Sequence, residues 1–182
     1  MKWRFLMSEV KDIAQLGAEV LRLRAQDVQD INASEIQEVI GDLFISLAST
    51  SGVGLAAPQI SASWRMMIIA SRPSARYPYA PEMEPTLMIN PSFESLSDVR
   101  EKDWEGCLSI PGIRAKVPRY TKIKVNYINA VGDAVIQDLE GFVARIFQHE
   151  YDHLDGLVYL DRVESNKDVI SEGEFLKLTS GT

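Results

Sequence analysis

Cysteine and histidine are scarce in this sequence, and their scarcity restricts the chemistry that the chain can perform. Among its 182 residues there is one cysteine, Cys107, so no disulfide can form within the chain. A lone thiol fits a reducing compartment. The only two histidines are His149 and His153. A metal site that needed more than two nitrogen ligands would therefore have to recruit other residue types.

Long apolar runs and an excess of positive charge are also missing. No stretch approaches 18 uncharged apolar residues, so no membrane span is predicted. The early apolar run, residues 5–7, is too short for the core of a signal peptide. A net charge of −7 argues against binding to a nucleic-acid backbone. The basic residues at 114–124 are flanked by acidic segments and are expected on a solvated surface. We therefore expect a cytoplasmic protein without nucleic-acid or membrane partners.

The periodicity of apolar residues predicts helices near both ends and strands between them. A helix is expected at 32–49, where Ser34 and Gln37 have the spacing of a capping box. A second helix is expected at 142–154, stopped by Gly156. Strands are predicted at 64–70, at 86–90 up to Pro91, and in a hairpin at 122–129 and 134–139. Residues 71–85 are expected to form a loop, and the chain from Glu164 a polar, partly mobile tail.

These elements predict an α+β fold built mainly of antiparallel β-sheets, with an N-terminal helix and a second helix in the C-terminal half that carries the candidate chemistry. A chain of this length can bury a sizeable core. We expect residues 1–182 to form a single catalytic domain, with the polar tail beginning at about residue 164.

The predicted second helix contains His149-Glu150-Tyr151-Asp152-His153, an H-E-x-x-H motif. Two histidines four residues apart project from one helix face and can hold one metal ion. Metal coordination lowers the pKa of a bound water to roughly 7, and the neighbouring Glu150 can take its proton. Two surface histidines would give the same five letters. However, Phe142 and Ile146 lie on or near the same stripe, so the stripe is partly buried, and a buried polar group needs a partner such as a metal.

A catalytic metal site generally has a third protein ligand and one open position. Because no further histidine exists, the third ligand must be an Asp, a Glu or Cys107. A lone cysteine is more often a small buried apolar residue. Cys107, however, follows Gly106 in the sequence Glu-Gly-Cys-Leu-Ser, where glycine lets another backbone approach closely.

Three blocks in this order make the sequence resemble the peptide deformylase family. They are residues 52–59 (GVGLAAPQ), 105–109 (EGCLS) and 148–153 (QHEYDH). The resemblance extends from about residue 17 to 161. It implies that Cys107, His149 and His153 bind the metal and that Glu150 acts as general base and acid.

The resemblance also implies roles for residues around the metal. Gln59, through its side-chain amide, and Leu108, through its backbone N–H, would donate to the formyl oxygen as it gains charge. Peptide-binding positions carried over from the family are Val53, Gly54 and Gly106 for backbone pairing, Phe142 and Ile146 for the methionine pocket, and Arg114 at the far end of the peptide. Glu105 and Arg119 would form a structural ion pair. On pattern alone, Phe142 and Ile146 indicate core packing.

The implied activity is removal of the N-formyl group from the formyl-methionine of newly made polypeptides, with release of formate. The implied partners are nascent chains at the ribosome, so the implied location is the bacterial cytoplasm or, alternatively, an organelle. Sulfur and nitrogen ligands suit zinc or ferrous iron. The family favours Fe²⁺ in the cell, with Zn²⁺, Ni²⁺ or Co²⁺ able to replace it in purified protein.

Two other functions share part of this pattern. A metalloprotease would take its third ligand from a tail glutamate, namely Glu164, Glu172 or Glu174. A non-catalytic zinc-stabilised binding module would close its site with four protein ligands. The identity and number of the ligands therefore distinguish these alternatives from deformylation.

Overall fold

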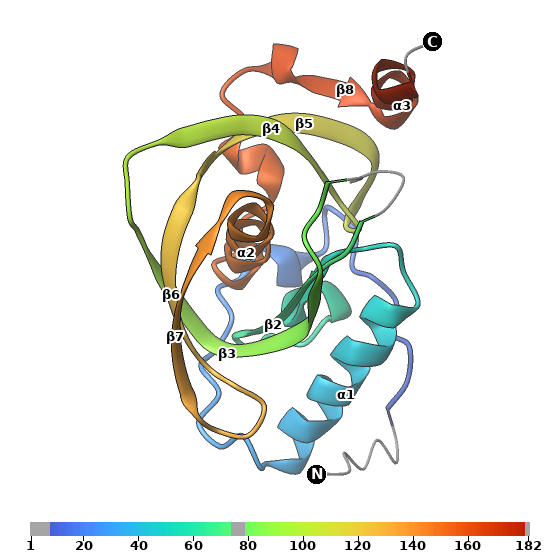
Figure 1. Cartoon of the computed structure of the whole chain (residues 1–182). Coiled ribbons are helices and arrows are strands. Elements are labelled where there is room, and N and C mark those ends of the chain that lie inside the picture. The colour runs from blue at the N-terminus through green and yellow to red at the C-terminus, as the bar shows by residue number, and fades with distance from the viewer. Residues whose placement is uncertain (1–7, 74–78, 181–182) are drawn as a thin grey trace.

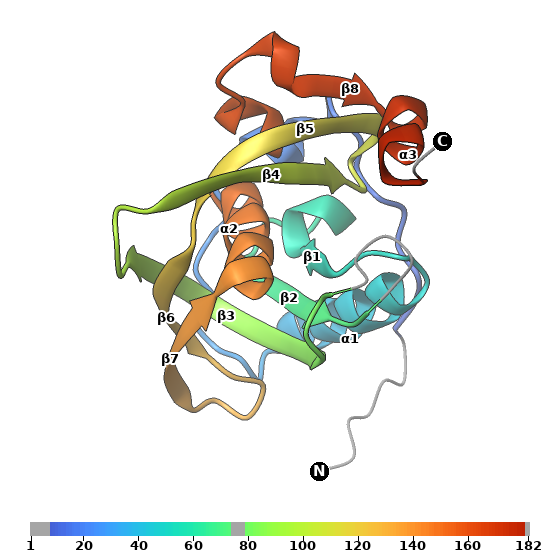
Figure 2. The same ribbon diagram turned by 45° about the horizontal axis from the view of Figure 1, so that its top comes forward.

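One helix, α2, runs through the middle of the molecule between two antiparallel β-sheets (Figures 1 and 2). The computed structural model describes residues 8–73 and 79–180, so residues 5–7 and the centre of the predicted 71–85 loop lie outside the described residues. The α-helices are α1 (Ser34–Ala48), α2 (Gly141–Leu154) and α3 (Glu172–Ser180). The strands are β1 (Gly54–Ala56), β2 (Met66–Ser71), β3 (Met83–Ser95), β4 (Arg100–Cys107), β5 (Ile110–Tyr120), β6 (Lys122–Ile128), β7 (Ala134–Glu140) and β8 (Val169–Ser171). Short 3-10 helices are η1 (Glu19–Arg22), η2 (Ala57–Ile60), η3 (Tyr159–Arg162) and η4 (Asn166–Asp168). The α+β class with antiparallel sheets is confirmed.

The larger sheet has the strand order β1-β2-β3-β6-β7 and is covered by a helix on each face. Successive side chains of a strand point to opposite faces. In β2, Met66 and Ile68 therefore pack in the core that includes α1, and Met67 and Ile69 pack in the core that includes α2. This explains why β2 reads as one continuous apolar run. The predicted buried strand and the 122–139 hairpin are confirmed.

The smaller sheet has the order β4-β5-β8 and lies on the other side of α2 (Figure 2). Beneath it lies a smaller core of Ile110, Ala115, Val117, Val158 and Tyr159. Within the described residues, β1 is an edge strand of the larger sheet and β4 is an edge strand of the smaller one. Residues of both these edge strands line the same cleft.

Several predicted element ends are wrong. β3 begins at Met83 and β2 includes Ser71, although both residues lie in the segment 71–85 that was expected to be a loop. The Ser34/Gln37 capping box does not form, because α1 begins at Ser34 with Ala33 as its N-cap, and the Gln37 amide donates to the Ile31 carbonyl at 2.7 Å. Pro91 does not end its strand. β3 continues to Ser95 because the register shifts between Ile89 and Ser92, and a bulge accommodates a residue without an N–H.

The polar tail is also more ordered than expected over its described residues. β8 pairs with β5, with Arg114 opposite Ile170, and α3 buries Phe175 to 5 % exposure. A short segment can be held in this way because the edge of a sheet supplies its backbone partners. Among the described residues, no helix is long and apolar enough to cross a lipid bilayer.

The basic stretch at 114–124 is only partly a solvated surface. Arg114 and Arg119 are 4 % and 5 % exposed, and both form ion pairs inside the protein. Arg119 follows Ala115 and Val117 on the inward face of β5, and Arg114, on the other face of the strand, lines the cleft. For these two arginines the prediction of a solvated surface is wrong, because nearby carboxylates compensate their burial.

Candidate functional site

The centre of the cleft is a cluster of one thiol and two imidazoles. Cys107 is the last residue of β4, and His149 and His153 are one turn apart on α2. Their ligating atoms lie within 4.8 Å of one another, and Cys107 Sγ is 3.3 Å from His153 Nε2. The structure thus brings together the three residues that were expected to bind a metal.

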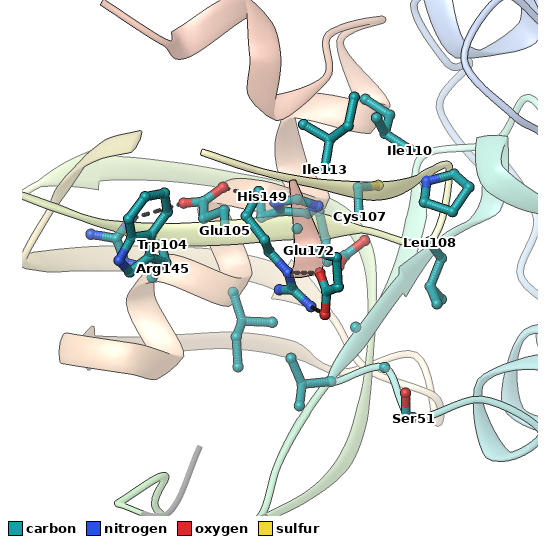
Figure 3. Close-up of a pocket in the computed structure, with 18 of the residues that line it drawn as sticks. Ser51, Trp104, Glu105, Cys107, Leu108, Ile110, Ile113, Arg145, His149 and Glu172 are labelled. Carbon is teal, nitrogen blue, oxygen red and sulfur yellow. Dashed lines mark hydrogen bonds and ion pairs between the residues drawn. The ribbon is translucent and has the colours of Figure 1, made fainter. Parts of the chain in front are cut away.

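Glu105 fixes the orientation of His149. Its Oε2 is 2.8 Å from His149 Nδ1, which leaves Nε2 as the nitrogen that faces the cluster (Figure 3). Tyr159 stacks on the same imidazole with ring centroids 5.9 Å apart. Metal-bound histidines are commonly oriented by such a carboxylate, which sets the tautomer.

Glu105 is itself held by two buried arginines. Arg119 Nε and Arg145 Nη1 each lie 2.9 Å from Glu105 Oε1. Burial alone would raise the pKa of Glu105, but the charge of Arg119 and the contacts with His149 outweigh it and hold this pKa well below its usual value. Arg119 also pairs with Asp152 of α2 at 2.6 Å. The expected Glu105–Arg119 pair is therefore present, within a network that ties β4, β5 and α2 together.

The donor set suits a metal ion. Burial alone would raise the pKa of the Cys107 thiol, but the charge of His153 and the contact with His149 outweigh it and lower this pKa well below its usual value. A thiolate with two imidazole nitrogens is a borderline-soft set of the kind that zinc and ferrous iron prefer. Within the described part of the chain, the buried polar atoms left without a partner include His153 Nδ1 and Glu150 Oε2. Both belong to the H-E-x-x-H motif, so the vicinity of the cluster still has hydrogen-bonding capacity for a ligand.

Glu150 is buried beside this cluster, against β1. Burial raises the pKa of Glu150 to about 7, close to the value at which a carboxyl can both accept and donate a proton near neutrality. A Cβ at Gly54 would lie 2.4 Å from Glu150 Oε1 and 2.7 Å from its Cγ. Glycine at position 54 is therefore what makes room for this carboxylate.

Gln59, in η2, directs its amide nitrogen toward the same centre. Its Oε1 accepts the Ala56 N–H at 2.9 Å, so Nε2 is the inward-facing atom, 3.5 Å from Cys107 Sγ and 3.2 Å from Ser109 Oγ. Pro58 precedes it as one of the first residues of η2. Leu108 follows Cys107 directly, so its backbone N–H belongs to the turn that carries the thiol.

The cleft around these residues has a volume of about 290 Å³. It is lined by every residue expected to contact the peptide, namely Val53, Gly54, Gly106, Arg114, Phe142 and Ile146. Phe142 and Ile146 line the cleft and also pack against the core under α2, and their role in a methionine pocket stays a prediction. Sequence reasoning gave no place in the cleft to Trp104 or Arg145, and it considered Glu172 only as a metal ligand of the metalloprotease alternative. Of these, Glu172 follows β8, and no local pattern indicated that the tail returns to the cleft.

The tail glutamates do not join the metal cluster. Glu172 pairs with Arg114, Glu164 with Lys102 and Glu174 with Lys177. In the part of the chain that the structure describes, the cluster has three candidate ligands rather than four. Neither the third ligand of the metalloprotease alternative nor the closed site of a zinc-stabilised module is found there.

Comparison with known proteins agrees with this geometry. A family model described as polypeptide deformylase matches residues 10–169. A peptide deformylase 2 from Nostoc sp. is 51 % identical over 172 residues, covering 94 % of this chain and 96 % of that protein. A class I type b peptide deformylase from Acinetobacter baumannii, crystallised with Met-Ala-Ser, superposes with a TM-score of 0.82 at 39 % identity, covering 86 % of this chain and all of that one. A peptide deformylase from Synechococcus elongatus in complex with actinonin gives a TM-score of 0.76 at 33 % identity, over 93 % and 86 % of the two chains.

Proposed function

The chain belongs to the peptide deformylase family, and on that premise we propose how its residues carry out the reaction. The enzyme hydrolyses the formamide at the N-terminus of newly made polypeptides. Water adds to the formyl carbon, the carbon–nitrogen bond breaks, and formate and a free amine are released. The observation that carries the assignment of residues is the clustering of Cys107, His149 and His153 beside Glu150 in one cleft.

Cys107, His149 and His153 are the proposed metal ligands. The metal, when bound, supplies a Lewis acid that makes water easier to deprotonate at neutral pH. Glu105 acts through His149 by holding its Nδ1, so that Nε2 can serve as the ligand. Ferrous iron is the proposed ion in the cell, with Zn²⁺, Ni²⁺ or Co²⁺ as substitutes in purified protein.

Glu150 is the proposed proton carrier. Its carboxylate takes a proton from the attacking water and later gives it to the departing amine nitrogen. A carboxyl with a pKa near 7 suits both steps. Gln59 Nε2 and the Leu108 N–H are the proposed donors to the formyl oxygen as negative charge develops on it. Removal of one such donor typically costs about 3 kcal/mol of transition-state stabilisation.

The peptide is proposed to bind as an added strand in the cleft. β1 and β4 each have a free edge there, so Val53, Gly54 and Gly106 offer backbone groups to an extended chain. Phe142 and Ile146 supply an apolar wall for the methionine side chain. The Acinetobacter relative was crystallised with Met-Ala-Ser, which begins with methionine as the product of such a reaction would.

The wider setting follows from this substrate. We propose that residues 1–182 act as a single catalytic domain on N-formyl-methionyl nascent chains at the ribosome. The proposed location is the bacterial cytoplasm, with an organelle as the alternative.

The decisive experiment measures formate release from formyl-Met-Ala-Ser by protein that was purified without oxygen and whose metal content was assayed. We expect turnover by the iron-loaded enzyme and its loss in Glu150→Ala. Glu174→Gln, which changes an exposed glutamate that pairs with Lys177, should behave as the parent. Iron-loaded protein that releases no formate, or full activity in Glu150→Ala, would contradict the proposal.

A further inference from the structure

The C-terminal helix places an acidic side chain in the substrate cleft. Glu172 is the first residue of α3 and lines the cleft together with Arg114 of β5. The two form a bidentate pair. Arg114 Nε donates to Glu172 Oε2, and Nη2 donates to Oε1 at 3.0 Å; the dashed lines at Glu172 in Figure 3 mark this pair. Two parallel hydrogen bonds of this kind fix the guanidinium in both position and plane.

The pair lies close to the catalytic centre rather than at a remote surface. A Cβ at Gly106 would be 2.5 Å from Arg114 Nη1 and 2.6 Å from its Cζ, so the guanidinium lies directly on the backbone of Gly106. Gly106 immediately precedes Cys107, the proposed metal ligand. The charges of Arg114 and Glu172 therefore lie beside the path that is proposed for the peptide.

The position of Glu172 is built into the fold. Phe175, one turn further along α3, lies under the Arg114 guanidinium, 5.1 Å from the ring centroid, and meets Trp104 edge-on at 5.8 Å. β8 pairs with β5 immediately before α3 begins. The side chain of Glu172 remains 26 % exposed while that of Arg114 is 5 % exposed, so the carboxylate is the half of the pair that a ligand can reach.

We propose that Glu172 is a specificity-determining residue that makes this end of the cleft electrically neutral and thereby disfavours peptides with a negative charge shortly after the methionine. Removal of the Glu172 carboxylate would take away the anion that pairs with the Arg114 guanidinium in this part of the cleft. The inference rests on the proposed substrate cleft and concerns the charge of the peptide downstream of its first residue. The family model ends at residue 169, so Glu172 lies outside the matched positions.

The test compares Glu172→Gln with the parent on a set of C-terminally amidated formyl peptides. The set contains formyl-Met-Ala-Ser, its variants with Asp at the second or third position, and the corresponding Lys variants. For each charged peptide we divide its kcat/KM by the kcat/KM of the neutral peptide. Glu172→Gln should raise this ratio about fivefold for the Asp peptides, since an accessible charge pair contributes at most about that factor. The same substitution should lower the ratio for the Lys peptides. The effect should shrink in 1 M salt, where the screening length is about 3 Å.

Ratios measured within one preparation cancel any difference in the folded or metal-loaded fraction, so a purely structural role of the pair would leave them unchanged. Glu174→Gln is the matched control, because it removes the same charge from the same helix at a residue that pairs with Lys177. In Arg114→Met/Glu172→Gln the gain for Asp peptides should disappear. Ratios in Glu172→Gln that equal those in Glu174→Gln would overturn the inference, whereas failure of the parent to release formate from every peptide would overturn the proposed function itself.

Discussion

Replacement of Gly54 by alanine tests whether the position of Glu150 against β1 is the one that matters for catalysis. The new Cβ would lie 2.7 Å from Glu150 Cγ and Cδ. This distance is about 0.8 Å shorter than an ordinary carbon–carbon contact of roughly 3.5 Å. Because β1 is fixed by pairing with β2, with Gly54 opposite Ile69, the carboxylate is the part that must move.

A displacement near 1 Å of a reacting group can cost on the order of 100-fold in rate. We therefore expect kcat for formate release from formyl-Met-Ala-Ser to fall about 100-fold in Gly54→Ala, which corresponds to about 2.7 kcal/mol. KM should change much less, since alanine keeps the backbone groups that would pair with the peptide. Crowding of this kind typically costs about 1–3 kcal/mol of stability, so the thermal midpoint and the metal content must be measured in parallel.

A double-variant cycle separates displacement of Glu150 from general damage. Glu150→Ala removes the three atoms that the new Cβ would meet, so adding Gly54→Ala to Glu150→Ala should cost little stability or activity beyond the loss from Glu150→Ala alone. Residues in contact are expected to show such non-additivity. A folded, metal-loaded Gly54→Ala enzyme with parental kcat, or losses that simply multiply in the double variant, would refute the reasoning.

Three further predictions concern the metal and its support. A chelator should abolish formate release and lower the thermal midpoint, and re-addition of Fe²⁺ or Zn²⁺ should restore both. The midpoint should shift because an ion present at 1,000 times its Kd stabilises the folded state by about 4 kcal/mol. Unchanged turnover by metal-free protein would contradict a metal-dependent reaction. Glu105→Gln should weaken metal affinity about 10- to 100-fold, measured by competition with a chromophoric chelator, because it weakens the support of His149 Nδ1; parental affinity would show that this contact is dispensable. Arg119→Met should cost about 3–5 kcal/mol in urea unfolding, since it leaves the buried carboxylates of Glu105 and Asp152 without a main partner; a loss below 1 kcal/mol would mean that Arg145 and solvent compensate.

Several parts of the fold could be predicted from the sequence because local signals and burial agree. α2 shows apolar periodicity and ends before Gly156, whose φ of +74° suits a glycine stop. The 122–140 hairpin has the alternation of a sheet with one buried face: Ile123, Val125 and Tyr127 are buried and their neighbours are not. The proximity of Cys107 to the two histidines came from motif order rather than from periodicity, because His149 lies 42 positions after Cys107.

What could not be predicted depends on long-range partners. β4 carries charged residues at its first four positions, and all four are exposed at the sheet edge, so no alternation marks it as a strand. In β5, Arg119 occupies an inward position that would ordinarily be apolar, and only Glu105 and Asp152 make this possible. The tail becomes a strand and a helix because β5 offers it an edge, and Glu172 reaches the cleft only through that docking. Such pairings depend on residues far away in the chain.

The free edges of β1 and β4 have a consequence for when the enzyme can act. A chain that fills the gap between two strand edges must offer its own backbone N–H and C=O groups on both sides. A helical or already packed N-terminus has these groups engaged elsewhere and cannot enter. If the substrate binds as the proposed added strand, deformylation has to precede folding of the first residues of the substrate, and entry into this cleft competes with the folding of the emerging protein.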